Sequence, residues 1–318
     1  MRAIVRDRFG GPEVLRLAEL PRPVPAQGQV LVRVHAASVN PADRFFLAGT
    51  PWVTRPMSGI LRPRHRVLGR DVAGEVAELG PGVTTWQVGD AVYGEADFGS
   101  LAEYVLMPAD RLAAAPTRAG FVESAAVPLA GVTALQGLRD AGRLTAGGQL
   151  LVNGAAGGVG TFAVQIGSAL GAEVTGVVRS DAVDLMTSLG ADHVVDYTRE
   201  DFTAGSTRYD VILDLAGSQP VRACRRVLSP TGRYVASTGR MSRVVAAAAS
   251  SVLHRSQVTV FLARSTAADL ATLATMIDEG TVTPVIDRVL PLDDAPKALQ
   301  HLIDGHARGK TVVQVVEG

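Results

Sequence analysis

The chain has 318 residues, of which 47% are hydrophobic, and its 31 basic and 31 acidic side chains give a formal net charge of zero. This length and apolar content allow a large core and suggest about two domains. The balanced charge offers no basic excess to attract nucleic acid or an anionic membrane, so neither partner is expected. The chain opens on a strand pattern, without a signal peptide or an apolar span long enough for a membrane helix, so we expect a cytoplasmic protein.

The first third of the chain carries short strand patterns that are broken by glycine and proline. These patterns cover residues 29–34, 72–77, 91–93 and 101–105. Many short strands at this spacing are typical of a small, irregular β-barrel. We therefore predict that residues 1–118 form a β-barrel domain.

Helical and strand patterns alternate from residue 119 onward. The apolar strand patterns lie at 150–152, 173–178, 193–195, 209–213, 232–236 and 257–263. The alternation predicts an α/β domain over residues 119–263, with a doubly wound parallel sheet covered on both faces. Residues 264–318 add helix, strand, helix and strand, a segment too small to fold alone that we expect to return to the first domain.

A glycine-rich turn joins the strand at 150–152 to an amphipathic helix. Glycines let the backbone approach a pyrophosphate, whose charge is met by free N–H groups and by the positive end of the helix dipole. The strand at 173–178 follows the helix, and this context distinguishes a dinucleotide-binding turn from a chance glycine cluster. The turn residues expected to contact the cofactor are Gly154, Ala155, Ala156, Gly157, Gly158, Val159 and Gly160.

The end of the strand at 173–178 bears on the choice between NADH and NADPH. A carboxylate at this place serves the ribose hydroxyls of NADH, whereas an arginine pairs with the 2′-phosphate of NADPH. Arg179 and Ser180 come first and favour NADPH. Asp181 lies close to the distance expected of a ribose-binding acid, so the use of NADH stays open.

Small residues follow the next two strands of the predicted sheet, and an apolar segment ends the last strand. The carboxyl ends of parallel strands face the ligand crevice in this architecture, and small side chains there let ribose and nicotinamide approach closely. The cofactor contacts expected at these ends are Ala216, Gly217, Ser237, Thr238, Phe261, Leu262 and Ala263.

Short motifs follow one another in a specific order along nearly the whole chain. They are SVNPAD at 38–43, LGRDVAGEV at 68–76, VGDAVY at 88–93, GSLAEY at 99–104, PLAGVTA at 128–134, AAGGVG at 155–160, LGAD at 189–192 and GK at 309–310. Together they resemble the zinc-independent quinone oxidoreductase-like branch of the medium-chain dehydrogenase/reductase superfamily. The resemblance implies a GroES-like irregular β-barrel catalytic domain, a Rossmann nucleotide domain, and a nicotinamide bound in the cleft between them.

The resemblance also implies roles for single residues. Asn40 would offer an amide donor to the nicotinamide or the substrate oxygen, or would instead cap its own turn. Asp43 would shape the pocket or act as a helix N-cap, and Thr133 would hydrogen-bond the cofactor; these three are the candidate catalytic residues. Tyr197 would lie beside the 2′-phosphate and, with Arg179, favours NADPH. Lys310 would reach the cleft to contact the cofactor, or would be a solvated lysine at the start of a strand.

Ligands for a catalytic zinc are missing from the sequence. Zinc-dependent relatives carry a cysteine within the segment that is 38–43 here, a His-Glu pair in place of Arg70-Asp71, and a second cysteine near Ala130. In this chain Cys224 is the only cysteine, and the six histidines have no ligand spacing. A catalytic zinc needs about three protein ligands, so we expect no bound metal and no alcohol oxidation through a metal alkoxide.

Without a Lewis acid, the easiest hydride acceptors for NADPH are electron-poor carbons, as in a quinone or an α,β-unsaturated carbonyl compound. The sequence therefore predicts an NADPH-dependent quinone or enone reductase. An enoyl-thioester reductase and a non-catalytic NADPH-binding scaffold protein remain alternatives. Arg-Phe-Phe at 44–46 replaces the tyrosine that some enoyl reductases use as a proton donor, so water is the expected proton source. The resemblance also implies a homodimer or homotetramer, and we expect the apolar segment 257–263 to form the contact between subunits.

Overall fold

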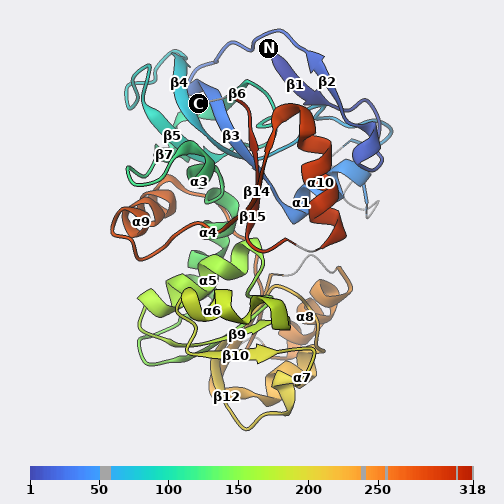
Figure 1. Cartoon of the computed structure of the whole chain (residues 1–318), viewed down its shortest axis with the longest axis vertical. Helices are drawn as coiled ribbons and strands as arrows, with labels where there is room; N and C mark the ends of the chain where they lie inside the picture. Colours follow the sequence, from blue (N-terminus) through green and yellow to red (C-terminus); the bar gives the residue numbers. More distant parts are fainter. Residues whose placement is uncertain (51–58, 238–240, 255–256, 306, 317–318) are drawn as a thin grey trace. The chain divides into compact units, whose positions relative to one another are not determined.

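The computed structural model describes all residues except 51–58, 238–240, 255–256, 306 and 317–318. The chain forms two compact units (Figure 1). Unit 1 comprises residues 1–129, 265–279 and 284–318, and unit 2 comprises residues 130–264 and 280–283. Thr238, one of the predicted cofactor contacts, lies outside the described residues.

Unit 1 is built on a seven-stranded sheet of mostly antiparallel strands. Its order is β14-β15-β3-β4-β5-β7, and β6 pairs with β3. The strands are β3 (Gln29–Val39), β4 (Asp71–Leu79), β5 (Ala91–Glu95), β6 (Tyr104–Pro108), β7 (Leu112–Ala114), β14 (Ile286–Pro291) and β15 (Lys310–Gln314). A separate two-stranded sheet pairs β1 (Arg2–Val5) with β2 (Arg16–Glu19). This is the predicted GroES-like barrel domain, with the strand pattern at 101–105 displaced toward 104–108.

The end of the chain is part of unit 1. Strand β15 pairs antiparallel with β3, with Thr311 opposite Val39, and β14 pairs parallel with β15. Leu292, Leu299 and Val313 are fully or almost fully buried in the same hydrophobic core as the barrel strands. The helices of this unit include α1 (Pro41–Ala48), α3 (Phe121–Ala125), α9 (Ala267–Asp278) and α10 (Ala295–Asp304).

Unit 2 contains a six-stranded parallel sheet in the order β10-β9-β8-β11-β12-β13. The strands are β8 (Gln149–Asn153), β9 (Glu173–Val178), β10 (His193–Asp196), β11 (Tyr209–Asp214), β12 (Leu228–Ala236) and β13 (Val258–Val260). This strand order is that of the Rossmann fold, in which ligands bind at the carboxyl ends of the strands. The predicted doubly wound sheet is confirmed, although β13 is shorter than the pattern at 257–263 because only three of its residues pair with β12.

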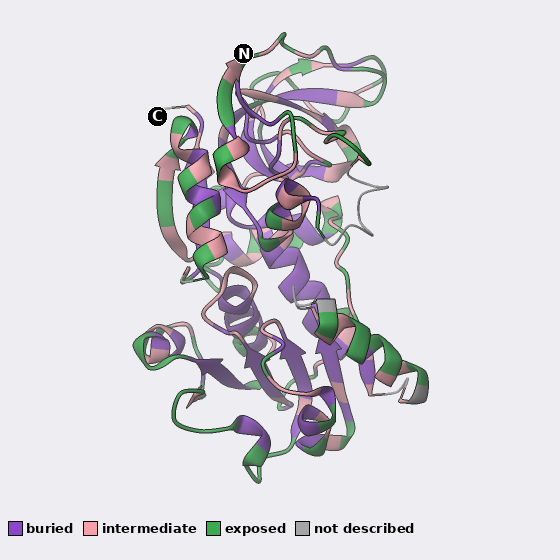
Figure 2. Ribbon diagram, turned by 90° about the vertical axis from the view of Figure 1, so that its right-hand side faces the viewer, coloured by how far each residue is buried: buried purple, intermediate pink, exposed green. Residues whose placement is uncertain are grey.

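Helices connect the strands of the unit 2 sheet, and the central strands are buried (Figure 2). The helices include α5 (Gly158–Ala169), α6 (Val183–Ser188), α7 (Val221–Arg226) and α8 (Met241–Leu253), while α4 (Pro128–Gln136) begins at the boundary between the units. Cys224 is fully buried on α7, and burial raises the pKa of its thiol to about 12. Among the described residues, no helix is both long and apolar enough to cross a membrane.

Candidate active site

Asn40 lies at the point where β3 ends and α1 begins. Its backbone is extended, with φ −130° and ψ 154°, and Pro41 follows at the first helical position, where a missing N–H costs nothing. The Oδ2 atom of Asp43 accepts a hydrogen bond from the Asn40 backbone N–H at 2.8 Å. Asn40 is therefore the N-cap residue and Asp43 the third residue of the helix, so the interpretation of Asp43 as an N-cap is wrong.

The Asn40 side chain belongs to a buried polar cluster of four residues in unit 1. Its Nδ2 donates to Asp71 Oδ2 at 2.9 Å, and its Oδ1 accepts from Lys310 Nζ at 2.5 Å. Ser38 Oγ donates to the same Asp71 oxygen at 2.8 Å. None of the four residues is more than 3% exposed, so Lys310 is not a solvated lysine.

Strand register explains how four residues so distant in sequence meet. Ser38 lies opposite Asp71 across the β3–β4 pair, and Val39 lies opposite Thr311 across the β15–β3 pair. Strand β3 therefore brings the first residue of β4 and the first residue of β15 to its own carboxyl end, beside Asn40. The cluster therefore depends on strand pairing that joins Asp71 and Lys310, which are 239 residues apart in the sequence.

Two further carboxyl groups lie around this cluster, and both ionise with difficulty. Burial, and secondarily the charge of Asp71, raise the pKa of Asp43 to about 6 and that of Glu95 to about 7. Glu95 lies opposite Asp71 in the β4–β5 pair and forms an ion pair with Arg70 at 2.8 Å. Asp43 Oδ1 is buried and has no hydrogen-bond partner among the described residues.

These side chains do not fit a zinc ion. The segments that supply zinc ligands in metal-dependent relatives hold Ser38, Asn40 and Arg70 here, and the carboxylate of Asp71 already binds the ammonium of Lys310 at 3.2 Å. An ammonium and a guanidinium repel a divalent cation, and soft or imidazole ligands are missing from these segments. In the described part of the chain, no group of three or more His, Cys, Asp or Glu side chains is arranged to hold a metal.

The glycine-rich turn of unit 2 has the backbone geometry of a phosphate site. Gly154 has a backbone φ of +90°, a value that residues other than glycine rarely adopt. A Cβ atom on Gly160 would lie 2.3 Å from the Gly154 carbonyl oxygen, so only glycine fits there. Gly157 is the N-cap residue of α5, whose first N–H groups are left for a ligand such as a pyrophosphate.

A buried polar network that the sequence analysis missed supports this turn. Asn153 Nδ2 donates to Asp214 Oδ1 at 2.7 Å, and Gly217 N–H donates to the same oxygen at 2.8 Å. Tyr234 OH donates to Asp214 Oδ2 at 2.5 Å, and burial followed by this carboxylate raises the pKa of the tyrosine. The network ties the ends of β8, β11 and β12 together. Its only sequence signal is a polar residue at the end of each of two apolar strands.

The residues predicted to bind the 2′-phosphate lie together at the carboxyl ends of β9 and β10. Arg179 binds Asp181 through two contacts, Nε to Oδ1 at 3.0 Å and Nη2 to Oδ2 at 2.5 Å. Ser180 Oγ donates to Asp196, and Tyr197 is 58% exposed while its backbone N–H bonds to β9. Arg179 and Ser180 are thus each held by a carboxylate.

The other predicted cofactor contacts also belong to unit 2. Thr133 is buried on α4, and Leu262 is 92% exposed beyond the end of β13. Those that directly follow a strand end or lie beyond it are Ala216, Gly217, Ser237, Phe261, Leu262 and Ala263.

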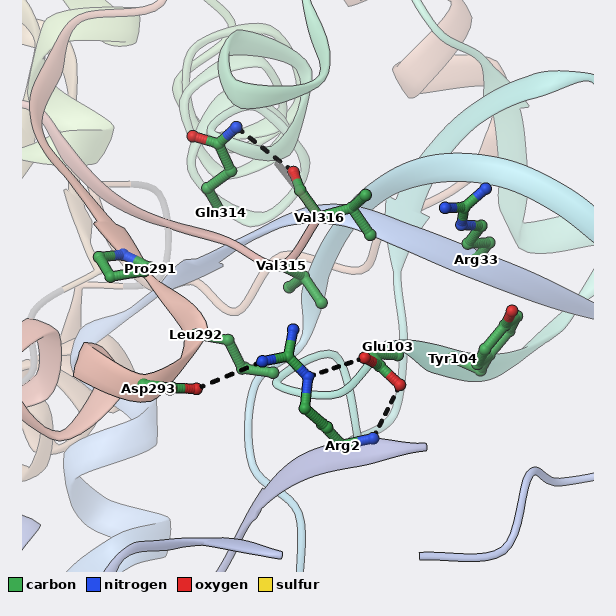
Figure 3. A pocket seen from close by; sticks show the side chains of 10 residues that line it. All are labelled: Arg2, Arg33, Glu103, Tyr104, Pro291, Leu292, Asp293, Gln314, Val315 and Val316. Carbon is green, nitrogen blue, oxygen red and sulfur yellow. Dashed lines mark hydrogen bonds and ion pairs between the residues drawn. The ribbon is translucent and has the colours of Figure 1, made fainter. Parts of the chain in front are cut away.

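A cavity of about 510 Å³ lies elsewhere in unit 1 (Figure 3). Arg2 crosses it, with ion pairs to Glu103 at 2.9 Å and to Asp293 at 3.9 Å. The described residues that line it include none of the predicted site residues. This cavity is therefore separate from the cluster around Asn40.

The barrel of unit 1 and the Rossmann sheet of unit 2 define the architecture of a medium-chain dehydrogenase/reductase. The family model for the alcohol dehydrogenase GroES-like domain matches residues 26–117, and that for the zinc-binding dehydrogenase matches residues 189–313. A chloroplast envelope quinone oxidoreductase homolog from Arabidopsis thaliana is 32% identical over 99% of this chain and 98% of its own.

Two further relatives agree. The chloroplastic NADPH-dependent alkenal/one oxidoreductase of Arabidopsis thaliana is 32% identical over 98% of this chain and 79% of its own. The solved quinone oxidoreductase of Coxiella burnetii has a TM-score of 0.89 and 32% identity, with 99% of each chain covered. The chain belongs to the quinone oxidoreductase-like branch of the medium-chain dehydrogenase/reductase superfamily.

The raised pKa of Glu95 predicts a pH dependence of stability. Because the folded pKa of about 7 lies above the ordinary glutamate value of 4.5, the proton on Glu95 stabilises the fold at low pH, and this contribution is lost as pH rises through 7. Glu95→Gln cannot ionise. Its free energy of unfolding relative to wild type should therefore rise by about 2 kcal/mol between pH 5 and pH 8.

Urea unfolding at several pH values measures this difference. Glu279→Gln, at an exposed glutamate that follows α9, is the matched control and should give the same difference at every pH. A Glu95→Gln curve that runs parallel to wild type from pH 5 to pH 8 would contradict the assignment.

Proposed function

We propose that the chain is an NADPH-dependent oxidoreductase that transfers hydride to a quinone or an α,β-unsaturated carbonyl compound. The observation that carries the proposal is that Asn40 and Asp71, in two of the segments where metal-dependent relatives keep zinc ligands, instead form a cluster with the ammonium of Lys310. Such a site offers a neutral amide donor and no Lewis acid, which suits acceptors that are already electron-poor. Relatives named quinone oxidoreductase and alkenal/one oxidoreductase support the same activity.

NADPH, when bound, supplies the hydride, and the protein has to orient it and stabilise the oxygen that gains charge. The glycine-rich turn would hold the pyrophosphate, and Arg179, Ser180 and Tyr197 would hold the 2′-phosphate. The cofactor would further be contacted by Asn40, Thr133, Ala216, Gly217, Ser237, Phe261, Leu262, Ala263 and Lys310, the last through the residues it touches. The amide of Asn40 would donate to the nicotinamide or to the substrate oxygen, and water would supply the proton.

A panel of acceptors tests the activity. We expect purified protein to oxidise NADPH in the presence of simple quinones or enones, and to do so equally with and without a chelator. The loss of nicotinamide absorbance measures the rate. Faster turnover with enoyl thioesters would favour the alternative of an enoyl-thioester reductase. Binding of NADPH without turnover of any acceptor would favour a scaffold protein, and chelator-sensitive alcohol oxidation would overturn the proposal.

Arg179 carries the predicted preference for NADPH. Arg179→Ala removes the cation that would pair with the 2′-phosphate, so the KM for NADPH should rise roughly 10-fold or more while that for NADH changes little. Arg208→Ala is the matched control, because this exposed arginine donates to carbonyl oxygens of its own loop, before β11. An equal change in KM for both cofactors would contradict the assignment.

The ion pair between Arg179 and Asp181 offers a complementary variant. Asp181→Asn frees the guanidinium, so the KM for NADPH should fall. If Asp181 binds the ribose hydroxyls instead, the same variant should raise the KM for NADH. Steady-state kinetics with both cofactors separate the two roles.

A homodimer or homotetramer would form through the edge of the unit 2 sheet. Strand β13 is an edge strand, and apolar side chains of Val245, Val252, Val260 and Leu262 are exposed on it or on the neighbouring α8 and loop. An exposed apolar edge invites pairing with a second copy. A cytoplasmic location and the absence of nucleic-acid and membrane partners stay predictions from the sequence.

Val260→Asp tests this contact, because a charge at the edge should prevent close pairing. Light scattering after size exclusion should report a dimer or tetramer for wild type and a smaller species for the variant. Val289→Asp is the matched control, since Val289 is exposed on β14, an edge strand of the unit 1 sheet. A wild-type monomer, or assemblies that survive Val260→Asp unchanged, would contradict the proposed contact.

A further inference from the structure

Lys310 is a buried cation whose three N–H donors are all used. Its Nζ lies 2.5 Å from Asn40 Oδ1, 3.2 Å from Asp71 Oδ2 and 3.4 Å from the Val39 carbonyl oxygen. The side chain is only 4% exposed, so it offers no free donor to a ligand. A direct contact of this ammonium with substrate would require it to break one of these bonds.

Asp71 is the counter-ion, and it is saturated as well. Its Oδ2 accepts from Ser38, Asn40 and Lys310, and its Oδ1 accepts from the Leu129 N–H at 3.0 Å. A buried carboxylate is stable only when it is paired and its lone pairs are filled. The ion pair with Lys310 therefore holds the Asp71 carboxyl group in the position where it accepts from the Asn40 amide.

The two charges act on opposite ends of one amide. Lys310 donates to Oδ1 of Asn40, and Asp71 accepts from its Nδ2. A flipped amide would place the NH₂ group against the ammonium and the oxygen against the carboxylate, so the two charges fix the orientation of the amide. Nδ2 carries a second N–H, which has no partner among the described residues although Asn40 is only 2% exposed. A buried N–H without a partner is costly, which indicates that this donor is kept for a ligand oxygen.

We propose that Lys310 is a positioning residue for the reaction: through Asn40 Oδ1 and Asp71 it holds and polarises the Asn40 amide, whose remaining N–H donates to the oxygen that gains charge during hydride transfer. Lys310 itself does not touch substrate. This inference rests on the proposed reductase function and deepens it. Only two of the chain's 31 basic residues are lysines, Lys297 and Lys310. A compact ammonium can reach three acceptors around one point, whereas a planar guanidinium cannot.

The central experiment is a double-mutant cycle between Lys310→Met and Asn40→Ala. Lys310→Met keeps an unbranched apolar stem and removes the charge, so kcat should fall roughly 10- to 100-fold while the Kd for NADPH changes less than about threefold. Because Lys310 acts through Asn40, adding Lys310→Met to Asn40→Ala should cost little more. The proposal would be overturned if the double variant lost kcat by the product of the two single losses. An unchanged kcat in folded Lys310→Met would overturn it as well.

Lys297→Met is the matched control, because Lys297 is exposed on α10 and pairs with Asp294. It should leave kcat unchanged. If Lys310→Met does not fold, Lys310→Arg is the second variant. It keeps a positive charge beside Asp71 but cannot make all three hydrogen bonds of the ammonium. We expect it to fold with reduced kcat, and full kcat in this variant would overturn the proposal.

A readout without turnover separates this inference from the proposed function. The side-chain amide of Asn40 gives a pair of ¹⁵N-coupled NMR signals, which should be sharp in wild type and shifted or broadened in Lys310→Met. Unchanged signals would refute the positioning role even in an active enzyme. Shifted signals in a protein that reduces no acceptor would instead refute the reductase function, and with it the catalytic use of the amide.

Discussion

A buried carboxylate needs a partner, and much of unit 1 is arranged around the one at Asp71. Its cation comes from Lys310, near the other end of the chain, so the last strand has to return to β3 for the pair to form. Removing one partner of such a pair typically costs about 3–5 kcal/mol, because the other charge stays buried. The packing of the last helix and strand into the barrel core is therefore coupled to the electrostatics of the site.

The parts of the molecule that could be predicted from the sequence are those determined by neighbours in the chain. The strand–turn–helix around Gly154 and the alternation that gives the parallel sheet are local patterns, and the structure contains both. The motif order identified the family, and the comparisons confirm it. The roles of single residues taken from the resemblance stay predictions.

The contacts that the sequence did not reveal join residues that are far apart in the chain. Lys310 after a glycine at the start of a strand resembles a solvated lysine, and only the register of β15 against β3 places it beside Asn40. Asp214 and Tyr234 meet for the same reason, at neighbouring ends of parallel strands. The prediction of Asp43 as an N-cap placed the start of α1 three residues too late. Proline is common at the first helical position, so Pro41 indicates that the residue before it, Asn40, is the N-cap.

The charges around Asn40 explain why a neutral amide is the donor left for chemistry. Arg70 is paired with Glu95 and Lys310 with Asp71, while burial, and secondarily the charge of Asp71, raise the pKa values of Asp43 and Glu95. Among the residues the structure describes, neither cation around Asn40 could approach a substrate oxygen without breaking its ion pair. An amide N–H that is polarised by the Lys310 ammonium at the amide oxygen can stabilise developing negative charge, and the amide stays neutral throughout.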